Sequence, residues 1–292
     1  MLKLASKTSM YFVVLLFTIF CAFPFLLILS SSLTSEDAIQ QFGYNLIPRE
    51  FDTTAYKVLF MDSARIINGY KITIMVTVVG TFLSLLITSM LAYPISLKRL
   101  KFRKSLNIFT LITILISGGI VPWYIVCVRY LHLQDSIWAL IVPYLCQAWN
   151  VFLLRSYFQT LPDEISESAK MDGAGEYSIF YRIIVPLSTP ALATVGLFIA
   201  LLYWNDWWLG LTLLNKTELQ PLQLLLRTIQ SNVQFLATSE QGAEIIRNTG
   251  GRLPSEGIKM AVSILTIGPV VFVYPFVQRF FIKGLTIGAV KG

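Results

Sequence analysis

The segment Glu167-Ser-Ala-Lys-Met-Asp-Gly-Ala-Gly175 lies between two long apolar runs, and Ile183-Ile-Val-Pro-Leu187 follows it where the second run begins. A connector between membrane helices needs only to be short and soluble. Here Pro162 and the two acids after it predict the start of a helix that runs to about Gly173. The pattern indicates a polar helix that stands out of a membrane and can bind a partner in the aqueous phase.

The composition is that of a membrane protein. Hydrophobic residues make up 55% of the 292 residues and charged residues 13%, whereas soluble proteins carry about a quarter charged residues. The mean hydropathy is +0.67. The net charge of +7 could indicate nucleic acid binding, but Lys and Arg also retain loops in the cytoplasm and face anionic lipid headgroups. We therefore expect the lipid bilayer, and no nucleic acid, as a partner.

Metal chemistry has little support in the sequence. His132 is the single histidine, and the three cysteines lie inside apolar runs without metal-ligand spacing. We expect no metal site and no catalytic residue.

Six apolar runs are long enough to cross a bilayer as helices. They cover residues 8–35, 72–97, 106–128, 137–154, 186–208 and 260–280. The first run exceeds the 7–15 residues of a cleavable signal core, so we expect an uncleaved helix. The prediction is an all-α integral membrane protein with six transmembrane helices, in which residues 1–292 form a single transmembrane domain.

Basic residues predict the orientation. Lys98, Arg99, Lys101, Arg103 and Lys104 crowd the short link between the second and third runs, which should therefore be cytoplasmic. By alternation, both termini and the loop 155–185 are also cytoplasmic. The connections 36–70 and 215–258 then lie outside.

Polar and aromatic residues near the membrane runs are candidates for a transport path. Trp204, Asn205 and Asp206 close the fifth run, and an acid near the membrane is a functional candidate. Tryptophans also form interfacial belts, so a structural role remains open. Further candidates are Trp123 and Tyr124, which follow the helix interruption predicted at Ser117-Gly-Gly119, and Gln147 and Asn150 in the fourth run.

The segment 167–187 resembles the "EAA" loop of ABC importer permeases, with Ser168 for the first Ala and Val185 for the Leu of its Ile-x-Leu-Pro ending. The chain is similar over nearly its whole length to the sugar (maltose-type) permeases, and most similar to the branch of LplC and YtcP type, which handles complex oligosaccharides. The resemblance implies the ABC type I importer permease fold. It assigns coupling to an ATPase to seven residues: Glu164, Glu167, Ser168, Ala169, Asp172, Gly173 and Ala174.

The same resemblance implies the partners and the location. These are a second homologous permease subunit, an ATPase dimer and an extracytoplasmic solute-binding protein, at the plasma (inner) membrane of a bacterium. The chain has no Gly-Lys pair and hence no Walker A loop. We expect it to bind no cofactor, with ATP and Mg on the partner ATPase.

The expected function is the transmembrane permease subunit of an ATP-driven importer for a carbohydrate, with oligosaccharides, including acidic ones, as the expected substrate class. The alternative is a secondary transporter or channel of unrelated fold, which would usually place several ionisable residues at the membrane midplane. Asp206 is the one acid within the six runs, near the end of the fifth. A membrane-embedded enzyme would need a cluster of acids, histidines or cysteines that the chain lacks.

Overall fold

The computed structural model describes residues 2–239 and 255–288, with side chains for residues 10–239, 255–271 and 275. The regular structure of these residues is helical apart from one isolated antiparallel bridge between Thr34 and Phe51. The predicted all-α class is therefore confirmed. The predicted outer segment 215–258 and the chain ends lie partly outside the described residues.

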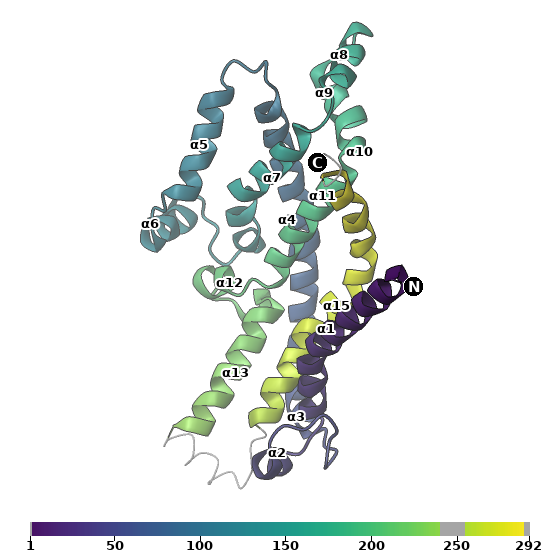
Figure 1. Ribbon diagram of the computed structural model, residues 1–292. Helices are drawn as coiled ribbons and strands as arrows, with labels where there is room; N and C mark the ends of the chain where they lie inside the picture. The colour runs from purple at the N-terminus through teal and green to yellow at the C-terminus, as the bar shows by residue number, and fades with distance from the viewer. Residues whose placement is uncertain (1, 240–254, 289–292) are drawn as a thin grey trace. The chain divides into compact units, whose positions relative to one another are not determined.

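The chain divides into two compact units, one of Met1–Ile66 and Leu225–Phe272 and the other of Ile67–Leu224 and Val273–Gly292. The first contains all or part of α1 (Leu2–Ser32), α2 (Glu36–Phe42), α3 (Thr54–Leu59), η1 (Phe60–Asp62), α13 (Leu222–Thr238) and α15 (Ser255–Gly288). The α-helices of this set are labelled in Figure 1.

In the first unit, a carboxylate caps the start of α15. The Glu36 side chain accepts hydrogen bonds from the Ser255 hydroxyl and from the backbone N–H groups of Glu256 and Gly257. The negative charge offsets the positive end of the helix dipole and satisfies N–H groups that have no partner within the helix. Tyr44 donates to Glu256 at 2.9 Å and adds a second contact at this point.

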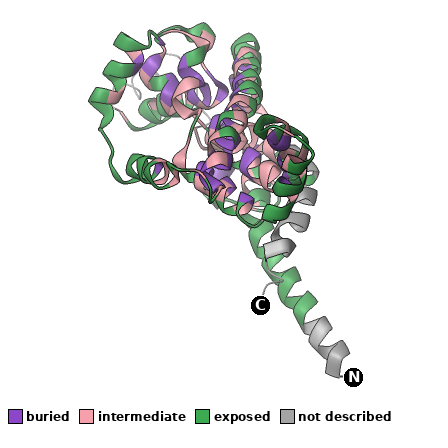
Figure 2. Cartoon of the chain, turned by 90° about the horizontal axis from the view of Figure 1, so that it is seen from above, coloured by how far each residue is buried: buried purple, intermediate pink, exposed green. Residues whose placement is uncertain are grey.

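Most of α1 presents apolar side chains to its surroundings. The side chains from Met10 to Phe25 are exposed, and α1 is green over much of the length that Figure 2 colours. A helix that is apolar on all sides suits lipid or a second protein. Its stretch Met10–Ser32 has the length and hydropathy of a membrane span.

The second unit contains most of the long helix α4 (Ser63–Ser96) and a series of shorter helices. These are α5 (Arg103–Leu115), α6 (Ile120–Ile125), η2 (Val126–Tyr130), η3 (Ile137–Leu140), η4 (Val142–Tyr144), α7 (Ala148–Phe158), α8 (Asp163–Met171), α9 (Glu176–Ile179), η5 (Phe180–Ile184), α10 (Val185–Leu187), α11 (Thr189–Trp204), α12 (Trp208–Leu213) and η6 (Thr217–Leu219).

Three predicted spans are bent rather than straight. Arg103–Leu115 and Ile120–Tyr130 meet at 111°, Ile137–Tyr144 and Ala148–Phe158 at 49°, and Glu176–Leu187 and Thr189–Trp204 at 82°. The described helices thus give two candidate spans, or five if each bent pair forms one.

The cause of the first of these breaks is visible in the sequence. Gly119 adopts φ +81° between α5 and α6, a conformation that glycine takes without steric cost, so the predicted interruption at residues 117–119 is confirmed. The run 186–208 is not one helix, because Asn205 to Trp207 separate α11 from α12.

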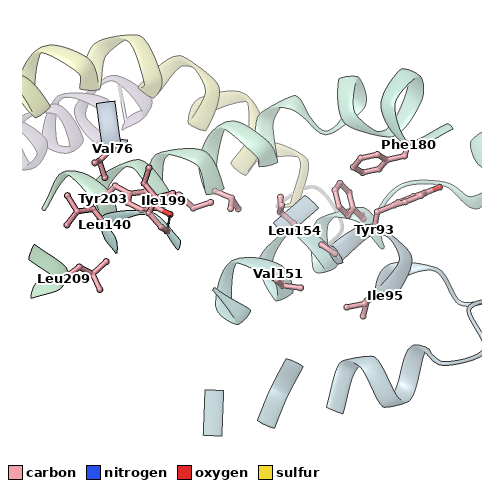
Figure 3. Packing of buried hydrophobic residues seen from close by; sticks show 14 of the residues in the cluster. Val76, Tyr93, Ile95, Leu140, Val151, Leu154, Phe180, Ile199, Tyr203 and Leu209 are labelled. Atoms are coloured by element: carbon pink, nitrogen blue, oxygen red, sulfur yellow. Dashed lines mark hydrogen bonds between the residues drawn. The ribbon is translucent and has the colours of Figure 1, made fainter. Parts of the chain in front are cut away.

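The core of the second unit lies where α4, α7, α9, η5 and α11 pack together, and Figure 3 shows part of it. Tyr203 of α11 is almost fully buried there. Its hydroxyl donates to the Ile141 carbonyl at 2.9 Å and lies 2.9 Å from the Ser84 hydroxyl of α4. This one side chain therefore ties α11 both to α4 and to the bent span 137–158.

Gly80 lies against the Tyr203 ring, and its missing side chain leaves room for that ring. A Cβ at Gly80 would lie 2.7 Å from the Tyr203 ring, whereas a Cβ at Gly196 would lie 3.5 Å from Leu85. We expect Gly80→Ala to displace Tyr203 and to cost roughly 1–3 kcal/mol of stability. Gly196→Ala, the matched control, should be neutral or slightly stabilising because alanine favours helices. Thermal unfolding of the purified protein in detergent measures both, and equal melting temperatures would contradict the packing argument.

Candidate functional site

Helix α8 carries most of the residues that the resemblance assigns to coupling. Acids stand in its first turn and Lys170 in its last, an arrangement that matches the helix dipole. Ser166 is buried on the inner side, and Ala169 is half-buried. The outward side is formed by four exposed residues of the predicted set: Glu164, Glu167, Ser168 and Asp172.

Gly173 and Ala174 end this helix in a defined way. Gly173 has φ +82°, its N–H donates to the Lys170 carbonyl, and the Ala174 N–H donates to the Ala169 carbonyl. These two bonds with a left-handed residue form a Schellman motif, which glycine favours strongly. The Asp-Gly-Ala sequence therefore has a structural reason: it stops α8 and turns the chain toward α9.

Two large apolar side chains extend from this region into the surroundings. Met171 is 88% exposed and Tyr177 is 76% exposed. Met and Tyr are enriched at protein interfaces, so these two side chains suit a surface that a partner covers. Tyr177 lies inside the segment 167–187, but nothing in the sequence distinguishes this exposed residue from the buried Phe180 nearby.

Ion pairs hold α8 and α9 against the link that follows α4. Arg99 donates to both carboxylate oxygens of Glu176 at 2.8 and 2.9 Å, and Lys170 also pairs with Glu176. Burial raises the pKa of the Glu176 carboxyl, but its bonds to Lys170 and Arg99 outweigh this and leave the pKa below its ordinary value. A further, exposed pair joins Lys98 to Asp163 at 3.3 Å. Glu176 is thus the point at which two helices and one loop meet.

A second candidate site is a pocket beside the break between α5 and α6. Its volume is about 550 Å³, and its walls include Trp123, Tyr144 and Trp208 together with the backbone of residues 117–119. The ring centroids of Trp123 and Trp208 are 5.0 Å apart. Aromatic walls suit a ligand that has apolar faces, because the rings can stack on those faces.

Asp206 is connected to this pocket through Tyr144. One oxygen of its carboxylate accepts from the Tyr144 hydroxyl at 2.9 Å, and the other accepts from the Leu209 N–H at 3.2 Å. The second bond caps the start of α12, the helix that carries Trp208. Asp206 therefore positions two pocket walls.

The structure separates the other predicted path residues from this pocket. Trp204 is only 9% exposed, and Asn205 donates from its side chain to the Leu201 carbonyl at 2.9 Å. Asn150 is buried, and Gln147 and Tyr124 are also absent from the pocket lining. Sequence reasoning selected Trp123 and Asp206 but missed Tyr144 and Trp208. Trp208 lies two residues after Asp206 at the end of the fifth run, whereas nothing in the sequence marks Tyr144.

Comparison with known proteins places the chain among transporters. No family model matches it. It is 37% identical over 282 residues to the polygalacturonan/rhamnogalacturonan transport system permease protein YtcP of Bacillus subtilis, covering 97% of this chain and 96% of that one. It is 38% identical to protein LplC of the same species, covering 92% and 89% of the two chains.

A solved structure agrees. A chain in the crystal structure of a bacterial ABC transporter involved in the import of the acidic polysaccharide alginate matches with a TM-score of 0.78 and 29% identity, over 95% of this chain and 96% of that one. Permeases of this family are transport components that leave ATP hydrolysis to a partner ATPase and receive solute from a binding protein. Identity at this level along almost the full length shows that the chain belongs to the permease subunits of carbohydrate ABC importers.

Proposed function

We propose that the chain forms half of the transmembrane path of an ATP-driven importer for acidic oligosaccharides. Its partners in this proposal are a second homologous permease, an ATPase dimer that binds ATP and Mg, and an external solute-binding protein. The chain itself binds no cofactor.

The observation that carries the proposal is the geometry of α8. The helix ends in a Schellman motif, is fixed through Glu176 and Arg99 to the rest of its unit, and presents Met171 and Glu167 outward. A rigid, anchored helix with an exposed apolar residue can transmit movement of a bound ATPase to the membrane helices. The assigned coupling residues form the outer face and the end of this helix.

Two glycines of this loop differ in backbone conformation. Gly173 needs its left-handed conformation, while Gly175 has φ −74°, and a Cβ at either would meet nothing within 4 Å. Gly173→Ala should therefore cost about 1–2 kcal/mol of local stability and reduce ATPase binding by roughly fivefold or more. The measurement is the amount of ATPase that copurifies with the permease pair, together with sugar uptake.

Gly175→Ala is the matched control and should behave as the wild type. Gly173→Asn should recover part of the loss, since Asn tolerates the left-handed region. Normal ATPase binding by Gly173→Ala would remove the coupling role from the end of α8.

The proposed membrane arrangement has six spans with both termini in the cytoplasm. Two helices and three bent pairs supply five spans, and α15 (Ser255–Gly288) contains the sixth, at 260–280. Bent spans are compatible with lipid when side chains or neighbouring helices satisfy the freed backbone groups. The basic link 98–104 then lies at the cytoplasmic face, on the same side as α8.

Cysteine labelling tests this arrangement. In a variant without native cysteines, Gln134→Cys should react with a membrane-impermeant maleimide added to spheroplasts, and Ser105→Cys should react only after the membrane is opened. Both positions are exposed in the structure, so burial does not explain a difference. The reverse pattern would invert the topology.

The substrate class comes from the relatives and from the aromatic pocket. Among the relatives, YtcP is named for polygalacturonan and rhamnogalacturonan, and the solved transporter for the acidic polysaccharide alginate. Trp123 and Trp208 provide surfaces on which sugar rings can stack. We place the saccharide path along this pocket, next to the helix break at residues 117–119.

Substrate-stimulated ATP hydrolysis by the reconstituted importer with its binding protein tests the path. Oligogalacturonate should stimulate hydrolysis, and a neutral glucose oligomer of equal length should not. Losing one stacking ring costs roughly 1–3 kcal/mol, so Trp208→Ala should raise the half-saturating concentration about tenfold. Trp149→Ala is the control, because Trp149 is 66% exposed and does not line the pocket. Equal values for both variants would exclude the pocket.

A further inference from the structure

A groove between α5 and α7 brings three cations together. Arg103 and Lys104 begin α5, and Arg155 lies in the last turns of α7. All three line one cavity of about 520 Å³, and no acidic residue lines it. We call it the basic groove.

The groove changes character along its length. Asn107 follows the cations on α5, and Ile108 and Leu111 follow Asn107, so charge gives way to apolar surface over two helical turns. Phe152 adds an aromatic wall from α7, one turn before Arg155. The cationic end and the apolar end therefore lie in a fixed order.

The positive charges of the groove are incompletely compensated. The Arg103 Nε donates to the Ile95 carbonyl at 3.1 Å, which fixes that side chain. The Nε of Arg155 is buried without a hydrogen-bond partner among the described residues, and its guanidinium carbon lies 5.7 Å from the Phe152 ring centroid. The positive charges of Arg103 and Arg155 also repel each other. Since an arginine stays charged, an anion in the groove would relieve this repulsion.

Two cations next to the groove are paired with carboxylates, whereas no carboxylate lines the groove itself. Lys98 pairs with Asp163, and Arg99 pairs with Glu176. These residues come from the same short link as Arg103 and Lys104. The carboxylates of the loop thus neutralise the first half of the link and leave the second half to another anion.

We propose that the basic groove binds one anionic phospholipid, with its phosphate at Arg103, Lys104 and Arg155 and an acyl chain along Ile108, Leu111 and Phe152. Basic pockets between helices at the cytoplasmic face suit anionic headgroups. The proposal rests on the placement of the link 98–104 at that face. A free sugar acid or phosphate would leave the apolar end without a ligand.

The bound lipid braces the helix that leads to the coupling loop. Arg155 lies three residues before the end of α7, and α8 begins at Asp163. A phospholipid that joins α5 to α7 therefore steadies the base from which α8 extends.

Lipid retention by the purified, complete importer tests the proposal. The complex is equilibrated in detergent with equal amounts of phosphatidylglycerol and phosphatidylcholine, and the lipids that remain after washing are counted by native mass spectrometry. We expect the wild type to retain phosphatidylglycerol preferentially. The double variant Lys104→Gln with Arg155→Gln should lower this retention about tenfold, because each lost basic residue should weaken phospholipid binding roughly a few-fold. Lys101→Gln with Arg182→Gln removes the same charge outside the groove and should have no effect.

A second variant separates lipid binding from assembly. Leu111→Ser keeps every charge and should also reduce retention, while the yield of assembled complex stays normal. Equal phosphatidylglycerol retention by the groove variants and the wild type would overturn the proposal, as would no retention by the wild type. Displacement by soluble glycerophosphoglycerol would assign the site to phosphate alone, and displacement by oligogalacturonate would assign it to the substrate. Lipid retention is measured without transport. A failure of the proposed transport function can therefore be distinguished from a failure of the lipid proposal.

Discussion

The structure depends on satisfying backbone hydrogen bonds wherever a helix is broken inside the membrane. An unpaired N–H or C=O costs several kcal/mol in lipid, so each break needs a side chain as a partner. Tyr203 donates to the Ile141 carbonyl, and Asp206 accepts from the Leu209 N–H. These bonds allow irregular backbone where an unbroken helix would otherwise be required.

The breaks also create the candidate saccharide pocket. An unbroken helix over residues 106–128 would hold residues 117–119 within its own hydrogen-bond ladder. The break at Gly119 instead puts residues 117–119 in the wall of the pocket, where Trp123 lies against Trp208. Asp206 links stability to the site, because it caps α12 and bonds Tyr144. Its polar character is therefore needed whether or not it touches a sugar.

Local features of the fold and the site were predictable from the sequence, and distant contacts were not. Apolar length predicted a helical membrane protein, and two adjacent glycines predicted the break before α6. The Asp-Gly-Ala spacing marked the end of α8, although not its Schellman bonds. Apolar content cannot distinguish an α-helix from the 3₁₀ turns η3 and η4, so the 49° bend at residues 144–148 was missed. Tyr144 was missed because its partner Asp206 lies 62 residues away.

The basic residues near the link 98–104 differ in whether a carboxylate neutralises them. In the proposed topology the excess of basic residues keeps the link 98–104 on the cytoplasmic side, but orientation alone does not require that some cations be paired and others not. Arg99 pairs with Glu176 and holds α9 against this link, which is a structural use of charge. Arg103, Lys104 and Arg155 have no such carboxylate in their groove. A permease that works in an anionic leaflet has a supply of counter-ions at that depth. Part of the structure that supports α8 can therefore come from the membrane itself.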